Sequence, residues 1–248
     1  MLKGWRRANQ FETGLGAKLP PSYLKFWREW KETTPAAVHY IPKEGKYERN
    51  ELTGEVRPIQ NHHIPLQRVP EEDEGFWGGE AIIKGFQKRN AYKRRVPHFW
   101  VPVLKRSVLR SEILNEYFSM TVTHRTITQI LEHHGFDHYV LKTPACDIRS
   151  LLALKLKQRI LDSLQNNCPR WTDNPTRKDE IMKEYGKYLE NYTPEDIEWY
   201  GLSWDEAIKK IRLIIDNESP IVPHKDIFRS RLVEQLRAAG IDEAQGAQ

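Results

Sequence analysis

A regular alternation of hydrophobic and polar residues marks the middle of the 248-residue chain. Phe118, Met120 and Val122 alternate with hydroxyl-bearing residues, which is the period of two expected for a β-strand with one covered face. The residues before them also favour a strand. The stretch "RSEILNEYFSMTVTHRT" therefore predicts a hairpin whose strands are joined at Asn115 and Glu116.

Helical periodicity follows this hairpin and continues towards the end of the chain. A short helix is expected from a Thr126 cap to Gly135, because Thr and Gly are typical helix limits. A long helix is expected to begin at a Thr143 cap with Pro144 in its first position, where proline is well tolerated. Further amphipathic helices are predicted within residues 176–192, 203–217 and 223–240.

The N-terminal part has a different pattern. Aromatic residues recur at helical spacing between Ser22 and Glu32, which predicts a short helix whose aromatic stripe docks on a partner or on the rest of the chain. Five prolines then punctuate residues 34–75. Because proline removes a backbone donor and blocks helix, this segment is expected to be extended, irregular chain that lies along a surface.

These patterns predict an α+β fold. We expect a small antiparallel sheet with short helices as the core, preceded by an extended proline-rich N-terminal arm and followed by an α-helical C-terminal extension. The expected boundaries are residues 1–75 for the N-terminal helix and arm, 76–142 for the core and 143–248 for the extension. With 39% hydrophobic and 29% charged residues, the composition fits small cores and long arms that rest on another molecule.

Charge is segregated along the chain. Residues 81–111 contain nine Lys or Arg and no Asp or Glu, whereas residues 171–248 contain eleven basic and sixteen acidic residues. A basic middle favours a polyanionic partner, and an acidic tail indicates contacts of another kind.

The basic segment is the candidate nucleic-acid site. Its cations can neutralise phosphates, and its aromatic residues can stack on unpaired bases. The alternative is a solvated basic face from which Phe99, Val101 and Val103 alternate into the core, and we assign Phe99 to the core. The candidate contacts are Lys84, Lys88, Arg89, Tyr92, Lys93, Arg94, Arg95, His98, Trp100, Lys105, Arg106, Arg110 and Arg125.

Catalytic chemistry has little support in the sequence. Histidines occur at positions 62–63, 133–134 and 138, but adjacent histidines point apart, and the pair 133–134 is explained by closing a helix. No G-x-S-x-G motif is present. Cys146 and Cys168 are expected to be buried or incidental thiols in a reducing compartment. We therefore predict no enzyme activity, no catalytic residue, no metal and no cofactor.

Two features bear on location. No apolar run approaches the length of a membrane span, so a membrane role is not expected. The first eleven residues carry Lys3, Arg6 and Arg7 without an acid, as a mitochondrial targeting segment does.

The run "NAYKRRVPHFWVPVLKRSVLRSEILNEYFSMTVTHRTITQILEHHGFDHYVLK", residues 90–142, resembles the bacterial-type L-twenty-eight family of large-subunit ribosomal proteins. The shared elements are a K-R-R-like stretch, a strand, a hairpin, an Arg-Thr turn, a short helix and a Gly-Phe-Asp segment. The flanking motifs "VHY", "WGGE" and "VLKTP" are similar to those of long mitochondrial members. Some bacterial relatives bind zinc through cysteine pairs, which this sequence lacks.

The resemblance implies a structural constituent of the mitochondrial large ribosomal subunit in the matrix, which supports translation. The core would bind large-subunit ribosomal RNA, without a membrane or small-molecule substrate. The resemblance leaves the contacts of the acidic helical extension open, but like charge repels it from RNA, so we expect it to meet neighbouring ribosomal proteins. One alternative is a mitochondrial RNA-processing enzyme, which needs acids or histidines converging beside the basic segment. Another is a helical adaptor, whose partner binding would survive charge reversal in the basic segment.

Overall fold

The computed structural model describes residues 9–62, 64–218 and 222–238. It forms two compact units: residues 20–203, and a smaller unit from the two ends of the chain. Lys3, Arg6 and Arg7 of the expected targeting segment lie outside the described residues, as do His63 and the last residues of the final predicted helix.

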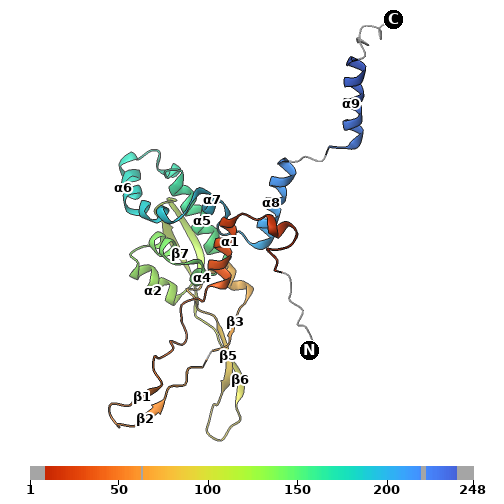
Figure 1. Ribbon diagram of the computed structural model, residues 1–248. Coiled ribbons are helices and arrows are strands. Elements are labelled where there is room, and N and C mark those ends of the chain that lie inside the picture. Colours follow the sequence, from red (N-terminus) through yellow and green to blue (C-terminus); the bar gives the residue numbers. More distant parts are fainter. Residues whose placement is uncertain (1–8, 63, 219–221, 239–248) are drawn as a thin grey trace, which may run out of the picture. The chain divides into compact units, whose positions relative to one another are not determined.

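The predicted central hairpin is confirmed in the larger unit (Figure 1). β7 (Leu104–Ser111) pairs antiparallel with β8 (Glu116–Thr123). Asn115 lies in the turn with φ at 50°, a conformation that Asn tolerates, and Glu116 begins β8. β4 (Gly75–Phe76) adds to the other edge of β8 in parallel orientation.

Helices cover one face of this sheet. They are α2 (His124–Glu132), α3 (Phe136–Lys142), α4 (Ala145–Ile148) and α5 (Leu151–Gln165). Phe76 packs edge-on against Phe136, and Met120 and Val122 are buried as their alternation predicted. The core is therefore formed by the side chains on the covered face of the strands and the apolar side chains of the helices that pack on them.

Two of the predicted helix starts are wrong. The cap of α2 is Thr123, whose Oγ1 accepts a hydrogen bond from the Thr126 N–H, so Thr126 lies in the first turn. The helix expected from Thr143 is divided: α4 ends at Arg149, which has φ at 56°, and Ser150 caps α5. The Arg149 carbonyl accepts a hydrogen bond from Trp30 Nε1 at 2.9 Å, a tertiary contact at the break.

The N-terminal helix is confirmed and its aromatic stripe packs on the rest of the unit. α1 (Pro21–Trp27) continues into a π-helical turn over Arg28–Glu32. The Phe26 ring lies 4.7 Å from the Tyr200 ring, next to the end of α7 (Pro194–Trp199). α6 (Pro175–Tyr185) precedes α7, and shorter helical turns of this unit occupy Pro70–Glu74, Pro169–Trp171 and Gly186–Asn191. A further helical turn, Gly14–Lys18, belongs to the smaller unit.

The proline-rich arm is mostly extended, but it contains a hairpin that was not predicted. β1 (Tyr47–Arg49) pairs antiparallel with β2 (Val56–Pro58). Further along, β3 (Leu66–Gln67) joins β5 (Ile82–Gln87) and β6 (Val96–Trp100) in a second antiparallel sheet of order β3-β5-β6. The α+β fold class is confirmed, while the boundaries at residues 75 and 142 stay predictions.

The smaller unit contains α8 (Trp204–Glu218) and α9 (His224–Ala238). Phe11 packs edge-on against Trp204 within it. In the part of the chain that the structure describes, a search for a helix of membrane-spanning length and apolarity finds none.

One cation lies inside the larger unit. Lys157 on α5 is 1% exposed, and its Nζ donates to the Thr143 carbonyl at 2.7 Å and faces the rings of Tyr192 and Tyr200. Burial lowers the pKa of Lys157 from 10.5 to about 8. The charged form is therefore disfavoured by desolvation, and one carbonyl oxygen and two ring faces compensate only partly.

This burial predicts a stability that changes with pH. Above pH 8 the folded chain releases the Lys157 proton while the unfolded chain retains it up to its ordinary pKa, so stability rises with pH in that window. The free energy of unfolding of the native protein, minus that of Lys157→Met, should rise by about 2 kcal/mol between roughly pH 7.5 and 9.5. Urea unfolding of both proteins checks this, and parallel pH profiles would contradict it.

Candidate nucleic-acid interface

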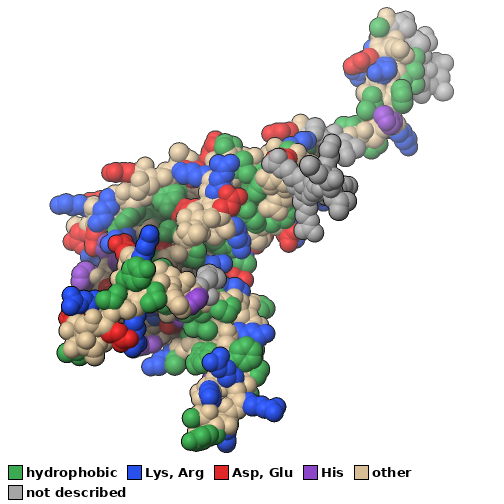
Figure 2. Space-filling view, turned by 60° about the horizontal axis from the view of Figure 1, so that its bottom comes forward, with side chains coloured by type: hydrophobic (Ala, Val, Ile, Leu, Met, Phe, Trp, Pro, Cys, Tyr) green, Lys and Arg blue, Asp and Glu red, His purple; other side chains and the backbone are tan. Residues whose placement is uncertain are grey.

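The β5–β6 hairpin presents most of the basic segment. Its strands pair from Ile83–Trp100 to Gln87–Val96, and residues 88–95 form the connecting loop. The loop side chains are exposed, and Tyr92 is 97% exposed. Figure 2 shows blue Lys and Arg side chains beside green hydrophobic ones on this hairpin, at the bottom of the view. The candidate residues of the loop are Lys88, Arg89, Tyr92, Lys93, Arg94 and Arg95.

Strand alternation gives the two faces of this hairpin different chemistry. Lys84 lies opposite Phe99 on one face, and the Lys84 Nζ is 6.0 Å from the Phe99 ring centre. Phe86 follows on the same face and is 67% exposed. This face thus combines a cation with two accessible aromatic rings, as a surface that stacks bases and binds phosphates requires.

The opposite face carries His98 and Trp100. Their rings meet edge to face at 4.8 Å. The Trp100 ring also lies over Gly85, where an added Cβ would come within 2.8 Å of it, so a larger residue would displace the ring. Trp100 thus packs on the strand while 43% of it stays exposed.

The expected burial of Phe99 is wrong. Phe99 is 47% exposed, and Val101 and Val103 are also exposed. Their alternation is real, but the β5–β6 hairpin extends beyond the covered sheet, so neither of its faces enters a core. The alternative in which this segment alternates into the core is therefore excluded for these three residues.

A second basic surface lies on the exposed face of the β7–β8 hairpin. Arg106 and Arg110 share this face with Tyr117, whose ring centre is 5.7 Å from the Arg110 guanidinium carbon. Arg106 Nε donates to Ser119 Oγ at 3.0 Å across the strands. Lys105 is also exposed but belongs to the other face, because adjacent strand residues point in opposite directions.

Arg125 differs from the other candidates. Arg125 lies in the first turn of α2 and is half-buried. Its Nε donates a hydrogen bond to the Gly78 carbonyl at 3.2 Å. Gly78 and Gly79 have φ of 58° and 82°, a backbone that favours glycine. Arg125 therefore helps to hold the glycine turn of the "WGGE" motif, and its contact with RNA stays a prediction.

The basic side chains between Lys84 and Arg110 have no acidic partner in the part of the chain that the structure describes. Among the described residues, no carboxylate forms an ion pair with any of the nine Lys and Arg of this segment. Their charges remain available for phosphates, and the absence of acids over residues 81–111 favours a positive potential over the β5–β6 hairpin and β7.

The sequence alone did not identify two neighbouring aromatic residues, Phe86 and Tyr117, as part of these surfaces. Both become visible only with the register, which places Tyr117 across from Arg110 and Phe86 on the face of Lys84. The signal that could have identified Phe86 and Tyr117 is an aromatic residue on a strand at the position of an exposed face that also carries a Lys or Arg.

The C-terminal extension is acidic only in part. Residues 171–218 hold seven basic and twelve acidic residues, whereas residues 222–238 hold four basic and two acidic ones. The acids also bind the chain itself. Asp196 pairs with Lys25 at 2.9 Å, and Glu184 Oε1 lies 2.9 Å from His138 Nε2. The description of the whole extension as acidic is therefore corrected: α9 carries an excess of cations.

The histidines and cysteines do not gather. A search of the described residues finds no group of three or more His, Cys, Asp or Glu placed to hold a metal ion. Cys146 and Cys168 are free and buried, as expected, and burial raises the pKa of both thiols. Neither thiol has the lowered pKa of a nucleophile.

A buried carboxylate fixes the turn that presents the second surface. Asp137 on α3 is 2% exposed, and its Oδ2 accepts hydrogen bonds from the backbone N–H groups of Glu112 at 2.6 Å and Ile113 at 3.0 Å. Burial raises the pKa of Asp137 although these bonds act in the opposite direction. This residue is the Asp of the Gly-Phe-Asp segment, and its role is to anchor the β7–β8 turn to α3.

Comparison with known proteins adds a second line of evidence. No protein-family model matches the sequence. Three animal proteins described as "Large ribosomal subunit protein bL28m" are similar to it over almost its whole length. The Drosophila melanogaster protein is 58% identical over 244 residues, covering 98% of this chain and 81% of the relative.

The two vertebrate relatives are more distant. The Bos taurus protein is 37% identical over 243 residues, covering 96% of this chain and 92% of its own length. The Xenopus laevis protein is 34% identical over 238 residues, covering 94% and 91%. The similarity therefore includes the arm and the helical extension as well as the core.

Proposed function

The chain belongs to the bL28m family of large ribosomal subunit proteins, and from this premise we propose how its surfaces are used. It is a structural constituent of the mitochondrial large ribosomal subunit in the matrix and supports mitochondrial translation. The resemblance seen in residues 90–142 is confirmed by relatives that match the chain along nearly its full length.

Large-subunit ribosomal RNA is the proposed partner of both basic hairpins. The observation that carries this proposal is the run of nine cations between Lys84 and Arg110, none of which forms an ion pair with a carboxylate of the described residues, with exposed aromatic rings set among them. Cations release counterions from phosphates, and rings stack on unpaired bases, so the combination suits a folded RNA better than a protein surface. Tyr92 and Trp100 are the proposed stacking residues.

The exposed face of β7–β8 would extend the same contact. Arg106 and Arg110 lie four residues apart on one strand, with Val108 between them, so their side chains point to the same face about four residue rises, or roughly 13 Å, apart. At this separation the two guanidinium groups can bind different phosphates of the same RNA. Tyr117 beside Arg110 would stack or pack against a sugar.

Neighbouring ribosomal proteins are the proposed partners of the acidic portion of the extension. The acid excess of residues 171–218 repels phosphate, which favours protein over RNA for this part. In this proposal the chain is used as three parts, residues 1–75, 76–142 and 143–248, with the middle part on RNA. The relatives carry the name of ribosomal subunit proteins, which favours a structural role without catalysis, cofactor or small-molecule substrate.

Ultraviolet crosslinking of purified mitochondrial large subunits tests the RNA contact. After digestion with RNase and trypsin, nucleotide adducts are expected on peptides within residues 82–110, and none on peptides of α6 or α7. Adducts confined to the helical extension, or none on the two hairpins of a protein that is present in the subunit, would overturn the assignment.

A further inference from the structure

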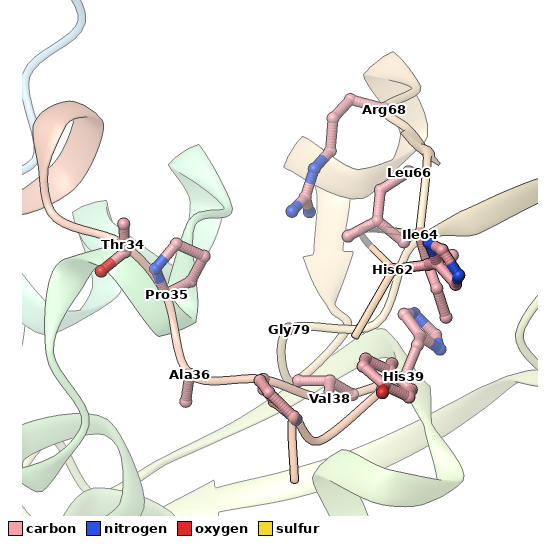
Figure 3. Close-up of a pocket in the computed structure, with 13 residues that line it drawn as sticks. Thr34, Pro35, Ala36, Val38, His39, His62, Ile64, Leu66, Arg68 and Gly79 are labelled. Atoms are coloured by element: carbon pink, nitrogen blue, oxygen red, sulfur yellow. The ribbon is translucent and has the colours of Figure 1, made fainter. Parts of the chain in front are cut away.

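A groove outside the basic hairpins lies beside β3 and is lined in part by its residue Leu66. It is a cavity of about 450 Å³ between two stretches of the arm, within the size range of ligand sites. Figure 3 shows Thr34, Pro35 and Ala36 on one side and Ile64, Leu66 and Arg68 on the other, with Leu66 and Arg68 pointing into the space between. The lining is completed by Ala37, Val38, His39, Tyr40, Pro42, His62 and Gly79.

Hydrogen bonds fix both walls of this groove. On one wall the Ala36 N–H donates to Asp147 Oδ1 at 2.7 Å, and the Ala81 N–H donates to His39 Nε2 at 2.9 Å. At the end, the Tyr40 hydroxyl donates to Asn61 Oδ1 at 2.7 Å. The opposite wall is held by the pairing of β3 with β5. Bonds within the chain thus restrain both walls, which reduces the conformational entropy that would be lost on binding.

The β3 wall offers an open strand edge. In the described part of the chain β3 pairs with β5 alone, and it is the outer strand of its sheet. Alternate residues of an antiparallel strand turn their N–H and C=O groups away from the partner, so the two residues of β3 leave one such donor and acceptor on the open side. An extended peptide satisfies such an edge by adding a strand.

The side chains select an apolar occupant. Val38, Ile64 and Leu66 line the groove and stay partly exposed, and no Asp or Glu is among the lining residues. Arg68 is the one lining residue with a permanent charge; its Nη1 binds the buried Glu72 carboxylate. A guanidinium has five N–H donors, so Arg68 can also receive a carboxylate from the groove. Without a Lys and with apolar walls, the groove does not suit the phosphates of RNA.

We propose that this groove binds an extended, mainly apolar segment of a neighbouring protein of the large subunit. The segment adds to β3 as a further strand, places alternate side chains against Val38, Ile64 and Leu66, and directs a carboxylate to Arg68. The proposal rests on the proposed function, because the partner is sought in the large subunit, but it concerns a surface separate from the two basic hairpins.

Photo-crosslinking in assembled subunits tests this proposal. The full-length protein carries a benzophenone amino acid in place of Ile64 and is incorporated into mitochondrial large subunits, which are then irradiated. We expect an RNase-resistant adduct whose trapped peptide is mainly apolar and contains Asp or Glu. Leu66→Asp and, from the other wall, Val38→Asp should each reduce its yield about tenfold. Leu52→Asp, at a residue 96% exposed in the β1–β2 turn, should leave it unchanged.

Amide hydrogen exchange provides a readout that does not depend on crosslinking. Exchange within residues 64–68 should be slower in the subunit than in the free protein, because the partner strand occupies the open edge. An adduct with RNA, an adduct that both Asp variants leave intact, or equal exchange in the two states would overturn the groove assignment. If the unsubstituted protein is absent from the subunit, the proposed function is contradicted. The proposal that a subunit protein binds in the groove then loses its basis.

Discussion

Replacing Arg94 and Arg95 with Glu should prevent incorporation of the protein into the mitochondrial large subunit. Both residues lie exposed in the β5–β6 loop, where no carboxylate of the described chain pairs with them. The double change converts two phosphate-binding cations into repelling anions. For a fragment of large-subunit RNA that includes the binding site, affinity should fall by at least about tenfold. The slope of log affinity against log salt concentration should become shallower by roughly 2.

A matched control separates this local effect from a general effect of charge. Lys183 and Lys209 are exposed cations of the helical extension, and their replacement by Glu makes the same change in net charge. The Lys183→Glu, Lys209→Glu protein should bind the RNA fragment with the original affinity and the original salt slope. Normal incorporation of the Arg94→Glu, Arg95→Glu protein would remove this loop from the binding surface.

Removing the Asp137 carboxylate should destabilise the larger unit by about 3 kcal/mol, because two backbone N–H groups, one buried and one partly buried, lose their acceptor. Those groups belong to Glu112 and Ile113 in the β7–β8 turn. Asp137→Ala should therefore lower the urea midpoint and speed amide exchange at these two residues more than elsewhere in the unit.

Asp137→Asn keeps one acceptor oxygen and should recover part of the lost stability. Asp173→Ala serves as the control: Asp173 is exposed, so its loss should change the free energy of unfolding by less than about 0.5 kcal/mol. Equal urea midpoints for the native protein and Asp137→Ala would show that the turn is held by other contacts. A stable but poorly incorporated Asp137→Ala protein would point to RNA contact by the turn itself.

Local periodicity correctly predicted the elements that have one face covered by other elements and one face exposed. The β7–β8 hairpin was recognisable because Met120 and Val122 face covering helices, so burial follows the strand period. The same expectation was wrong for Phe99. The alternation around Phe99 is just as regular, but no described helix or sheet covers either face of the β5–β6 hairpin. Alternation alone does not indicate whether another element packs on a strand.

The helix limits show where local chemistry is ambiguous. Thr123 and Thr126 are both suitable caps three residues apart, and the structure uses the first as cap and the second as its donor. At Arg149 the helix break involves a non-glycine residue with positive φ and a hydrogen bond from Trp30, 119 residues away in the chain. Only the tertiary structure supplies such a partner.

The candidate site could be located from the composition of the sequence, but the composition did not show which of its residues share a face. The absence of acids over residues 81–111 identified the basic segment, whereas the register was needed to separate Lys105 from Arg106 and to add Phe86 and Tyr117. Arg125 fitted the charge pattern equally well, yet its Nε is bonded to the Gly78 carbonyl. The groove beside β3 had no signal in the sequence, because its walls come from separate stretches of the arm.

Sedimentation of the tagged protein from mitochondrial extract decides whether the chain is part of the large ribosomal subunit. The protein should migrate in a gradient with that subunit, and RNase treatment should move the protein and the subunit RNA together towards the top. A protein that stays at the top of the gradient while the large subunit migrates normally would contradict this expectation.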